Sequence, residues 1–118
     1  MTNINHSISY IEFPLTKNVE TKRFYSEVFG WKFTDWGADY ISFTGANVEG
    51  GFNGIDNALP GKLGVLVVLY ANDLIKTRDA VANAGGQILQ DIYEFPGGKR
   101  FHFKDPNGNE LAVWSEKS

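Results

Sequence analysis

The chain has 118 residues, of which 42% are hydrophobic and 14% aromatic, and it carries a net charge of −3 and no cysteine. This apolar content excludes a disordered chain, and the length predicts one compact domain or two small halves that share a core. The acidic balance argues against nucleic acid as a partner, since phosphate binding needs clustered basic charge. Without cysteine, disulfides, thiolate zinc sites and cysteine nucleophiles are excluded.

The N-terminal residues and the hydropathy of the chain indicate the cellular location. The opening run "MTNINHSISYIEF" has no basic segment followed by a long apolar one, so we expect no signal peptide. No apolar run approaches the length of a membrane span. We therefore expect a soluble, cytoplasmic protein without a membrane partner.

The first half of the chain predicts a strand, a helix and three further strands. The run "ISYIEFPL" at 8–15 alternates apolar and polar side chains, which is typical of a half-buried strand. A helix is predicted over 16–30, with Asn18 as its N-cap and Gly30 as the residue that ends it. Short strands are expected at 31–36, 39–45 and 49–55.

The second half repeats this order. A strand is predicted over 63–71, apolar on both faces, and a helix over 72–86. Asn72 or Asp73 is the expected N-cap of this helix, and Gly85-Gly86 ends it. The last strands are expected at 87–95, 98–104 and 109–115.

Two turn signals punctuate this pattern. Residues 57–63, with Pro60-Gly61 inside, are the best candidate for a linker. The run "DPNG" at 105–108 fits a type I turn, because Asp accepts from the backbone, Pro presets φ and Gly closes the turn.

The order β-α-β-β-β therefore occurs twice, and such a repeat decides the fold prediction. We predict an α+β protein with two tandem βαβββ modules whose curved sheets form a shared cup. The chain 1–118 would be a single domain, with a first module at about 5–57, a linker at about 57–63 and a second module at about 63–116.

The run "IEFPL…FYSEVFGWKF…GG…ANDLIKTRDAVANAGGQIL…RFHFKDPNGNELAVW" resembles the vicinal-oxygen-chelate superfamily. That group includes glyoxalase I, bleomycin-resistance proteins, fosfomycin-resistance enzymes and extradiol dioxygenases, and this chain is most similar to small glyoxalase-like proteins of bacteria. The resemblance covers nearly the whole chain and implies the cup-shaped fold and a homodimer. It says less about function, because this fold hosts several chemistries and some non-catalytic binders. Packing and turn geometry alone explain six of its residues: Tyr25, Phe29, Gly30, Asp105, Pro106 and Gly108.

The resemblance also implies where metal ligands would lie. Metal-dependent members carry a His, Glu or Gln on the first and last strand of each module. By register, three of these positions hold Tyr10, Leu66 and Ala112, and the second falls near Glu49 to Asn53, where the alignment is open. Leu and Ala cannot bind a metal, and a neutral phenol is a poor ligand. We therefore expect no cofactor.

A displaced metal site is the alternative. Glu12 shares the strand face of Tyr10, and Glu110 shares that of Ala112, so both should face the cup. With His102, whose orientation the sequence leaves open, they could bind a divalent cation. The plainer interpretation places both carboxylates in water and makes His102 an ordinary strand residue.

Strand alternation predicts a mostly apolar cup with a few polar groups, the usual form of a small-molecule site. Phe33, Phe43 or Phe52 could add to its walls, unless the side chains simply fill the space between the sheets. Lys99 and Arg100 fit a solvated hairpin turn better than a flap over an anionic ligand. The predicted ligand-binding residues are Tyr10, Glu12, Leu66, Tyr70, Ala112 and Trp114, with Val68 beside them.

Three functional hypotheses follow. The first is a metal-independent small-molecule-binding protein of the glyoxalase/bleomycin-resistance type, with an aromatic or amphipathic ligand. The second is a metal-dependent lyase, isomerase or dioxygenase that uses the displaced site. The third is a structural or interaction module whose cup is filled.

Overall fold

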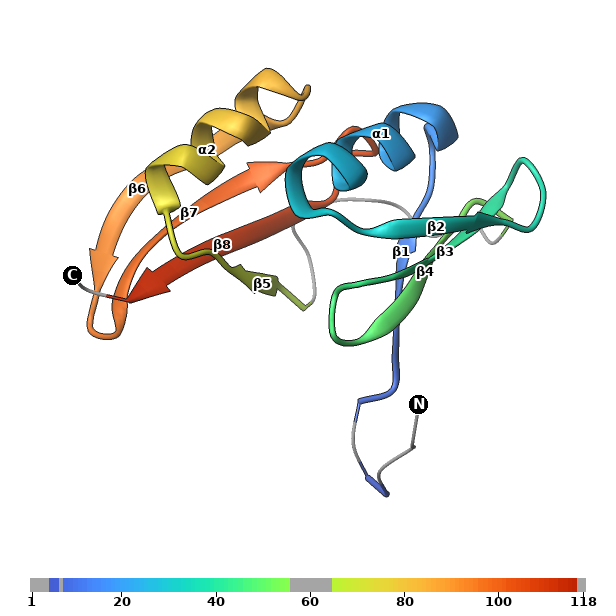
Figure 1. Ribbon diagram of the computed structural model, residues 1–118, viewed down its shortest axis with the longest axis horizontal. Helices are drawn as coiled ribbons and strands as arrows, with labels where there is room; N and C mark the ends of the chain where they lie inside the picture. Colours follow the sequence, from blue (N-terminus) through green and yellow to red (C-terminus); the bar gives the residue numbers. More distant parts are fainter. Residues whose placement is uncertain (1–4, 7, 56–64, 117–118) are drawn as a thin grey trace.

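The computed structural model describes residues 5–6, 8–55 and 65–116 and confirms the repeated βαβββ order (Figure 1). The predicted linker at 57–63 lies outside the described residues. The first module contains β1 (Tyr10–Pro14), α1 (Asn18–Phe29), β2 (Lys32–Asp35), β3 (Tyr40–Thr44) and β4 (Glu49–Asn53). The second contains β5 (Val67–Tyr70), α2 (Leu74–Asn83), β6 (Gln87–Phe95), β7 (Gly98–Lys104) and β8 (Glu110–Glu116).

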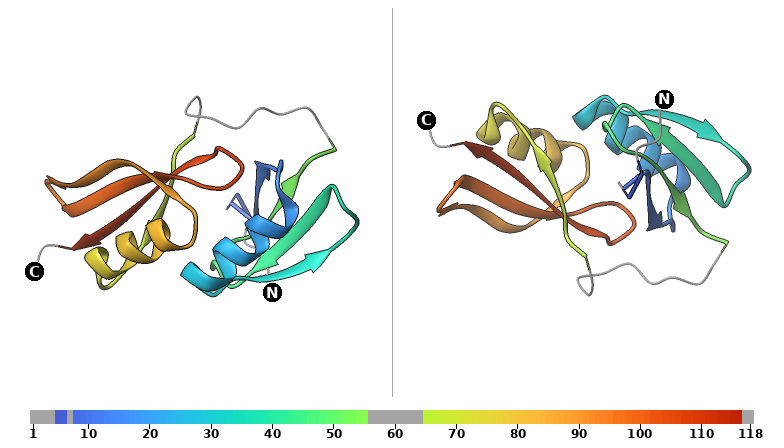
Figure 2. Two further views of the ribbon diagram at one scale, coloured as in Figure 1. Left: turned by 90° about the horizontal axis from the view of Figure 1, so that it is seen from above. Right: turned by 90° about the horizontal axis from the view of Figure 1, so that it is seen from below.

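Each module forms its own four-stranded sheet. The strand orders are β1-β4-β3-β2 and β5-β8-β7-β6, with one parallel pair in each, β1 with β4 and β5 with β8. Each helix covers one face of its sheet, and seen from below the strands lie in front of the helices (Figure 2). The described sheets are thus separate and do not close on each other, so each module keeps one face that no helix covers. We call this the open face.

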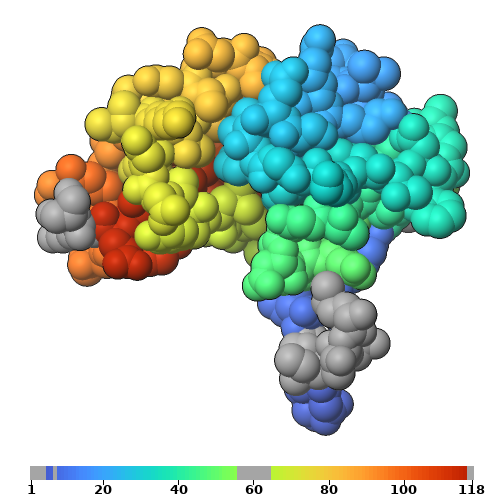
Figure 3. Space-filling model, in the orientation of Figure 1, coloured from blue at the N-terminus to red at the C-terminus, as the bar shows by residue number. Residues whose placement is uncertain are grey.

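The two modules stand side by side as two lobes that meet along α1 and α2 (Figure 3). A notch separates β5 from the hairpin of β3 and β4 on the side away from the helices (Figure 3). Neither of these helices, nor any other within the described ranges, is long and apolar enough to cross a membrane.

Helix α1 ends as predicted but does not begin as predicted. Gly30 ends the helix with a left-handed φ of 74°, as expected of a glycine in that position. Asn18 is not the N-cap: it is the first helical residue, and its side-chain amide donates to the carbonyl of Ala38 at 2.9 Å. The capping position is Lys17, which offers no capping side chain. Asn107 of the other module instead holds the chain just before the helix, because its Oδ1 accepts from the Lys17 amide at 2.9 Å.

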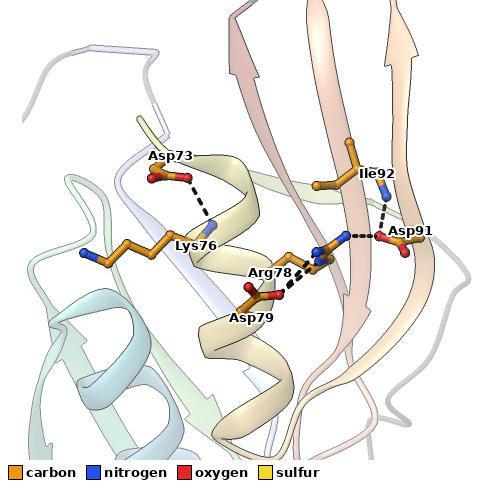
Figure 4. Close-up of polar contacts among 6 residues, drawn as sticks. All are labelled: Asp73, Lys76, Arg78, Asp79, Asp91 and Ile92. Carbon is orange, nitrogen blue, oxygen red and sulfur yellow. Dashed lines mark hydrogen bonds and ion pairs between the residues drawn. The ribbon is translucent and has the colours of Figure 1, made fainter.

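The start of α2 follows the prediction. The Asp73 carboxylate accepts a hydrogen bond from the Lys76 backbone amide at 3.1 Å and so caps the helix (Figure 4). Further along, the Arg78 guanidinium bridges Asp79 on α2 and Asp91 on β6 (Figure 4). These exposed contacts tie the helix to the outer strand of its sheet.

One aromatic core runs through both modules. Tyr25 stacks on Trp31 at 4.5 Å between ring centroids, and Trp31 stacks on Phe43 at 4.4 Å. Phe103 of β7 joins this cluster through Phe24 of α1, at 5.8 Å. Such pairs add to the free energy gained by burying the rings.

Two rings predicted as possible cup walls belong to this core. Phe43 and Phe52 are 3% and 0% exposed and lie on the helix side of their strands. The prediction is wrong for Phe52, whereas Phe43 also borders a hollow on the other face. Strand alternation explains the burial of both rings, since they share the face of Ile41 and Phe13 against α1. Phe33 is partly buried and packs against the same core.

The turn between β7 and β8 ties the modules together. Gly108 donates its amide to the Asp105 carbonyl at 3.0 Å, which closes the predicted turn. The buried Asp105 carboxylate accepts from the amides of Asn107 and Asn109 at 2.9 and 2.8 Å. It also accepts from the Tyr25 hydroxyl of α1 at 2.9 Å. Burial raises the pKa of Asp105, while these hydrogen bonds act to lower it.

Candidate functional site

The open face of the first module carries a line of hydrogen bonds. Tyr10 of β1 donates its hydroxyl to Tyr40 of β3, and Tyr40 donates to Glu12 Oε2 at 2.8 Å. The other Glu12 oxygen accepts from the Asn53 amide of β4 at 3.0 Å. Desolvation, together with the bonds to Tyr10 and Glu12, raises the pKa of Tyr40. The hydroxyl therefore stays protonated and keeps donating to the carboxylate.

A shallow hollow of about 430 Å³ lies beside this line, between Tyr10, Tyr40 and Trp36. The exposed Trp36 indole donates to Ser42 Oγ at 2.8 Å on the same face. Gly51 makes room here: a Cβ at this position would lie 2.5 Å from the Tyr40 hydroxyl and 2.6 Å from that of Tyr10. The hollow thus combines aromatic edges with a carboxylate nearby.

The open face of the second module carries an aromatic wall. Trp114 of β8 meets Tyr70 of β5 edge-on at 5.1 Å and Phe95 of β6 at 6.2 Å. Tyr70 is 49% exposed, so one side of the wall is open to solvent. Ala112, two residues before Trp114, lies between Val68 and His102 in the sheet and is fully buried.

A second line of hydrogen bonds runs next to this wall. The Arg100 Nε–H donates to the Tyr93 hydroxyl, which lies 2.8 Å from His102 Nε2. His102 Nδ1 lies 2.9 Å from Glu110 Oε2. Because Tyr93 accepts from Arg100, its own proton is free to donate to Nε2, and the proton on Nδ1 then donates to Glu110. Both nitrogens of the imidazole are engaged, and the side chains of His102 and Glu110 are only 14% and 13% exposed.

The predicted site residues are therefore divided between two faces. His102 and Glu110 meet, but Glu12 lies on the other sheet with Tyr40 and Asn53. Within the part of the chain that the structure describes, no three His, Asp or Glu side chains come together as a metal site would need. Leu66 is half-buried and precedes β5, which is shorter than the strand predicted over 63–71.

Comparison with known proteins bears on this fold. A family model described as the Glyoxalase/Bleomycin resistance protein/Dioxygenase superfamily matches residues 8–113. The chain belongs to this superfamily. The predicted family resemblance and the predicted two-module fold are confirmed. A comparison with curated proteins gave no match.

Solved structures of superfamily members share the fold. A glyoxalase-related enzyme from Fulvimarina pelagi is similar with a TM-score of 0.79 and 17% identity, over 94% of this chain and 88% of that one. A glyoxalase/bleomycin resistance protein/dioxygenase family enzyme from Burkholderia phytofirmans PsJN gives 0.78 and 16%, over 92% and 98%. TnmS3, an antibiotic-binding protein from Streptomyces sp. CB03234, gives 0.70 and 16%, over 99% and 100%. At such identities the likeness concerns the fold alone.

Several residues of these faces, among them Tyr40, Tyr93 and Phe95, are not predicted from the sequence. Strand alternation in "YISFT" could have found Tyr40, which shares a face with Ser42. Tyr93 could not be found that way, because the register of β6 against β7 shifts on both sides of Gln90. Arg100 was assigned to a solvated turn, but it lies within β7 opposite Trp114, so that assignment is wrong.

Proposed function

We propose that this superfamily member binds a small aromatic or amphipathic molecule on its open faces and does so without a metal ion. The observation that carries the proposal is the half-exposed wall of Tyr70, Trp114 and Phe95 next to a line of polar side chains. Apolar walls with a few oriented polar groups are what small-molecule sites consist of. Tyr10 and Glu12 would contribute from the first module.

Metal independence is supported by the residue types at the positions that the family resemblance marks as ligands. Leu66 and Ala112 have no donor atom, and the Tyr10 hydroxyl is hydrogen-bonded to Tyr40. His102, the best ligand type nearby, has both nitrogens in hydrogen bonds, and binding a metal would break one of them.

A homodimer is part of the proposal. Tyr10, Val68 and Tyr70 expose large apolar side chains on the two open faces. A second copy that brought its first module against this second module would cover these side chains and complete a cup. The name of TnmS3, an antibiotic-binding protein, supports a binding role for this fold. The cytoplasmic location remains a prediction.

The test is a titration of intrinsic tryptophan fluorescence with a panel of aromatic compounds. We expect at least one compound to shift the spectrum and Trp114→Ala to abolish the shift. Ile75→Ala, which changes an exposed side chain on helix α2 away from the open faces, is the matched control. No shift with any compound, or the same shift in Trp114→Ala, would contradict the proposal. Elemental analysis and thermal-shift titration with nickel, zinc, manganese and iron(II) test metal independence; near-stoichiometric metal would overturn it.

The pair of His102 and Glu110 favours one second candidate, a metal-dependent glyoxalase-like lyase or dioxygenase. Such a site would polarise a substrate oxygen, and a carboxylate would act as base. It needs a further ligand such as Glu12, which a second copy would have to supply. A glutathione-dependent methylglyoxal assay with added nickel, zinc or manganese tests it. Glu12→Gln and Glu110→Gln should then lose activity, and retained activity in both would remove the candidate.

A further inference from the structure

Arg100 is a cation without a counter-charge in the described part of the chain. The charged pairs there join Lys22 to Asp35, Arg78 to two aspartates and His102 to Glu110. No carboxylate oxygen of the described residues lies within 4.0 Å of the Arg100 nitrogens. A half-buried guanidinium loses part of its hydration, so an anion that binds there restores a favourable contact.

The guanidinium is also held in a defined orientation. Its Nε–H is used by the Tyr93 hydroxyl. Its central carbon lies 5.5 Å from the ring centroid of Tyr93 and 5.6 Å from that of Phe95, so two rings fix its plane. The terminal amino groups have no hydrogen-bond partner among the described residues. They present the planar fork that matches a carboxylate with two parallel hydrogen bonds.

The aromatic wall begins directly at this cation. Trp114 is the cross-strand partner of Arg100 in the β7–β8 register, and Tyr70 and Phe95 flank the indole. A flat ring that packs on Trp114 would therefore bring a group attached to its edge near the guanidinium. Glu110 lies at the far end of the Tyr93–His102 line, where it repels a second anion and favours a hydroxyl or amine instead. This charge distribution gives a bound ligand one orientation.

We propose that the open face of the second module binds a planar aromatic carboxylate, with its carboxylate on Arg100 and its ring on Trp114. The inference rests on the proposed binding function and names the ligand class. Specificity arises because an uncharged ring of the same shape keeps the contact with Trp114 but leaves Arg100 without an anion.

The experiment compares 2-naphthoate with 2-naphthamide by isothermal titration calorimetry on the full chain. We expect the acid to bind at least tenfold more tightly than the amide. Arg100→Gln should remove this preference, because it weakens binding of the acid far more than binding of the amide, which keeps its ring contact with Trp114. Lys99→Gln is the matched control, because it removes an exposed neighbouring cation on the other face of β7, and it should keep the preference. Higher salt should weaken binding of the acid alone.

Each failure has a distinct meaning. Equal binding of acid and amide, with both lost in Trp114→Ala, would overturn the carboxylate inference and leave the binding function standing. Binding of neither compound, nor of any in the fluorescence panel, would overturn both. An acid preference retained in Arg100→Gln would also refute the role of this residue. If thermal melts show that Arg100→Gln is unfolded, Arg100→Lys decides: we expect a several-fold loss for the acid, and unchanged affinity would refute the guanidinium contact.

Discussion

Asn107 is the residue whose removal tests the tertiary structure most directly. Its Oδ1 accepts from the backbone amides of Thr16 and Lys17, at 2.8 and 2.9 Å, and from the Thr21 hydroxyl at 3.1 Å. Thr16 and Lys17 directly precede α1 and Thr21 lies in its first turn, while Asn107 belongs to the β7–β8 turn of the other module. One amide oxygen thus fixes the chain at the start of a helix and links the two halves of the fold.

The expected cost of Asn107→Ala follows from these contacts. Each donor left unpaired costs about 1–3 kcal/mol where it is buried. Thr21 keeps a second hydrogen bond, to the Lys17 carbonyl, and water can reach part of the exposed Thr16 and Lys17 backbone. We therefore expect a total cost of about 2 kcal/mol, or a melting temperature lowered by roughly 10 °C.

Urea unfolding, followed by circular dichroism and tryptophan fluorescence, measures this free energy. The matched control is Asn18→Ala, because Asn18 is the cap that local sequence rules predict, yet it only donates to Ala38. We expect a change within about 1 kcal/mol for this control, the net value of a single exposed hydrogen bond. The reasoning is refuted if Asn18→Ala costs more than Asn107→Ala, or if Asn107→Ala lies within about 0.5 kcal/mol of the wild type.

Gly50→Ala should prevent folding, because the new Cβ lies 2.1 Å from a β1 backbone carbonyl. Gly51→Ala should cost only about 1–3 kcal/mol, because its Cβ lies near tyrosine hydroxyls that can move. Soluble yield and melting temperature compare the two variants, and equal values would contradict this reasoning. Tyr25→Phe should lower the free energy of unfolding by about 1.5–3 kcal/mol, since the buried Asp105 carboxylate loses a hydrogen-bond donor. Urea titration measures this change, and an unchanged unfolding midpoint would count against the contact. The pKa of Asp91 is lowered from 3.8 by the backbone amide of Ile92 and by the guanidinium of Arg78. The carboxylate therefore stabilises the fold above pH 3.8, and this contribution is lost as the pH falls through the folded-state pKa. Asp91→Asn should melt earlier than wild type at neutral pH and converge with it in acid, and a gap that stays constant with pH would refute the sign.

Local chemistry in the sequence determined the elements of this protein. Gly30, Asp73 and the Asp105 turn each act within a few residues of themselves, through a left-handed φ, a side-chain cap and a turn hydrogen bond. The period of apolar residues separates helices from strands for the same reason, since it reflects backbone geometry alone. These signals were enough to predict the repeated βαβββ order and the superfamily.

Only the tertiary structure decided which side chains meet. Tyr93 joins Arg100 and His102 because irregular pairing in β6 shifts the alternation on which face assignment depends. Asn107, and not Asn18, holds the start of α1 because a residue about ninety positions away accepts from the Lys17 amide, and no local rule contains that distance. Propensity and alternation act along the chain, whereas caps, charge partners and binding faces are set by contacts between segments that the chain brings together only when it folds.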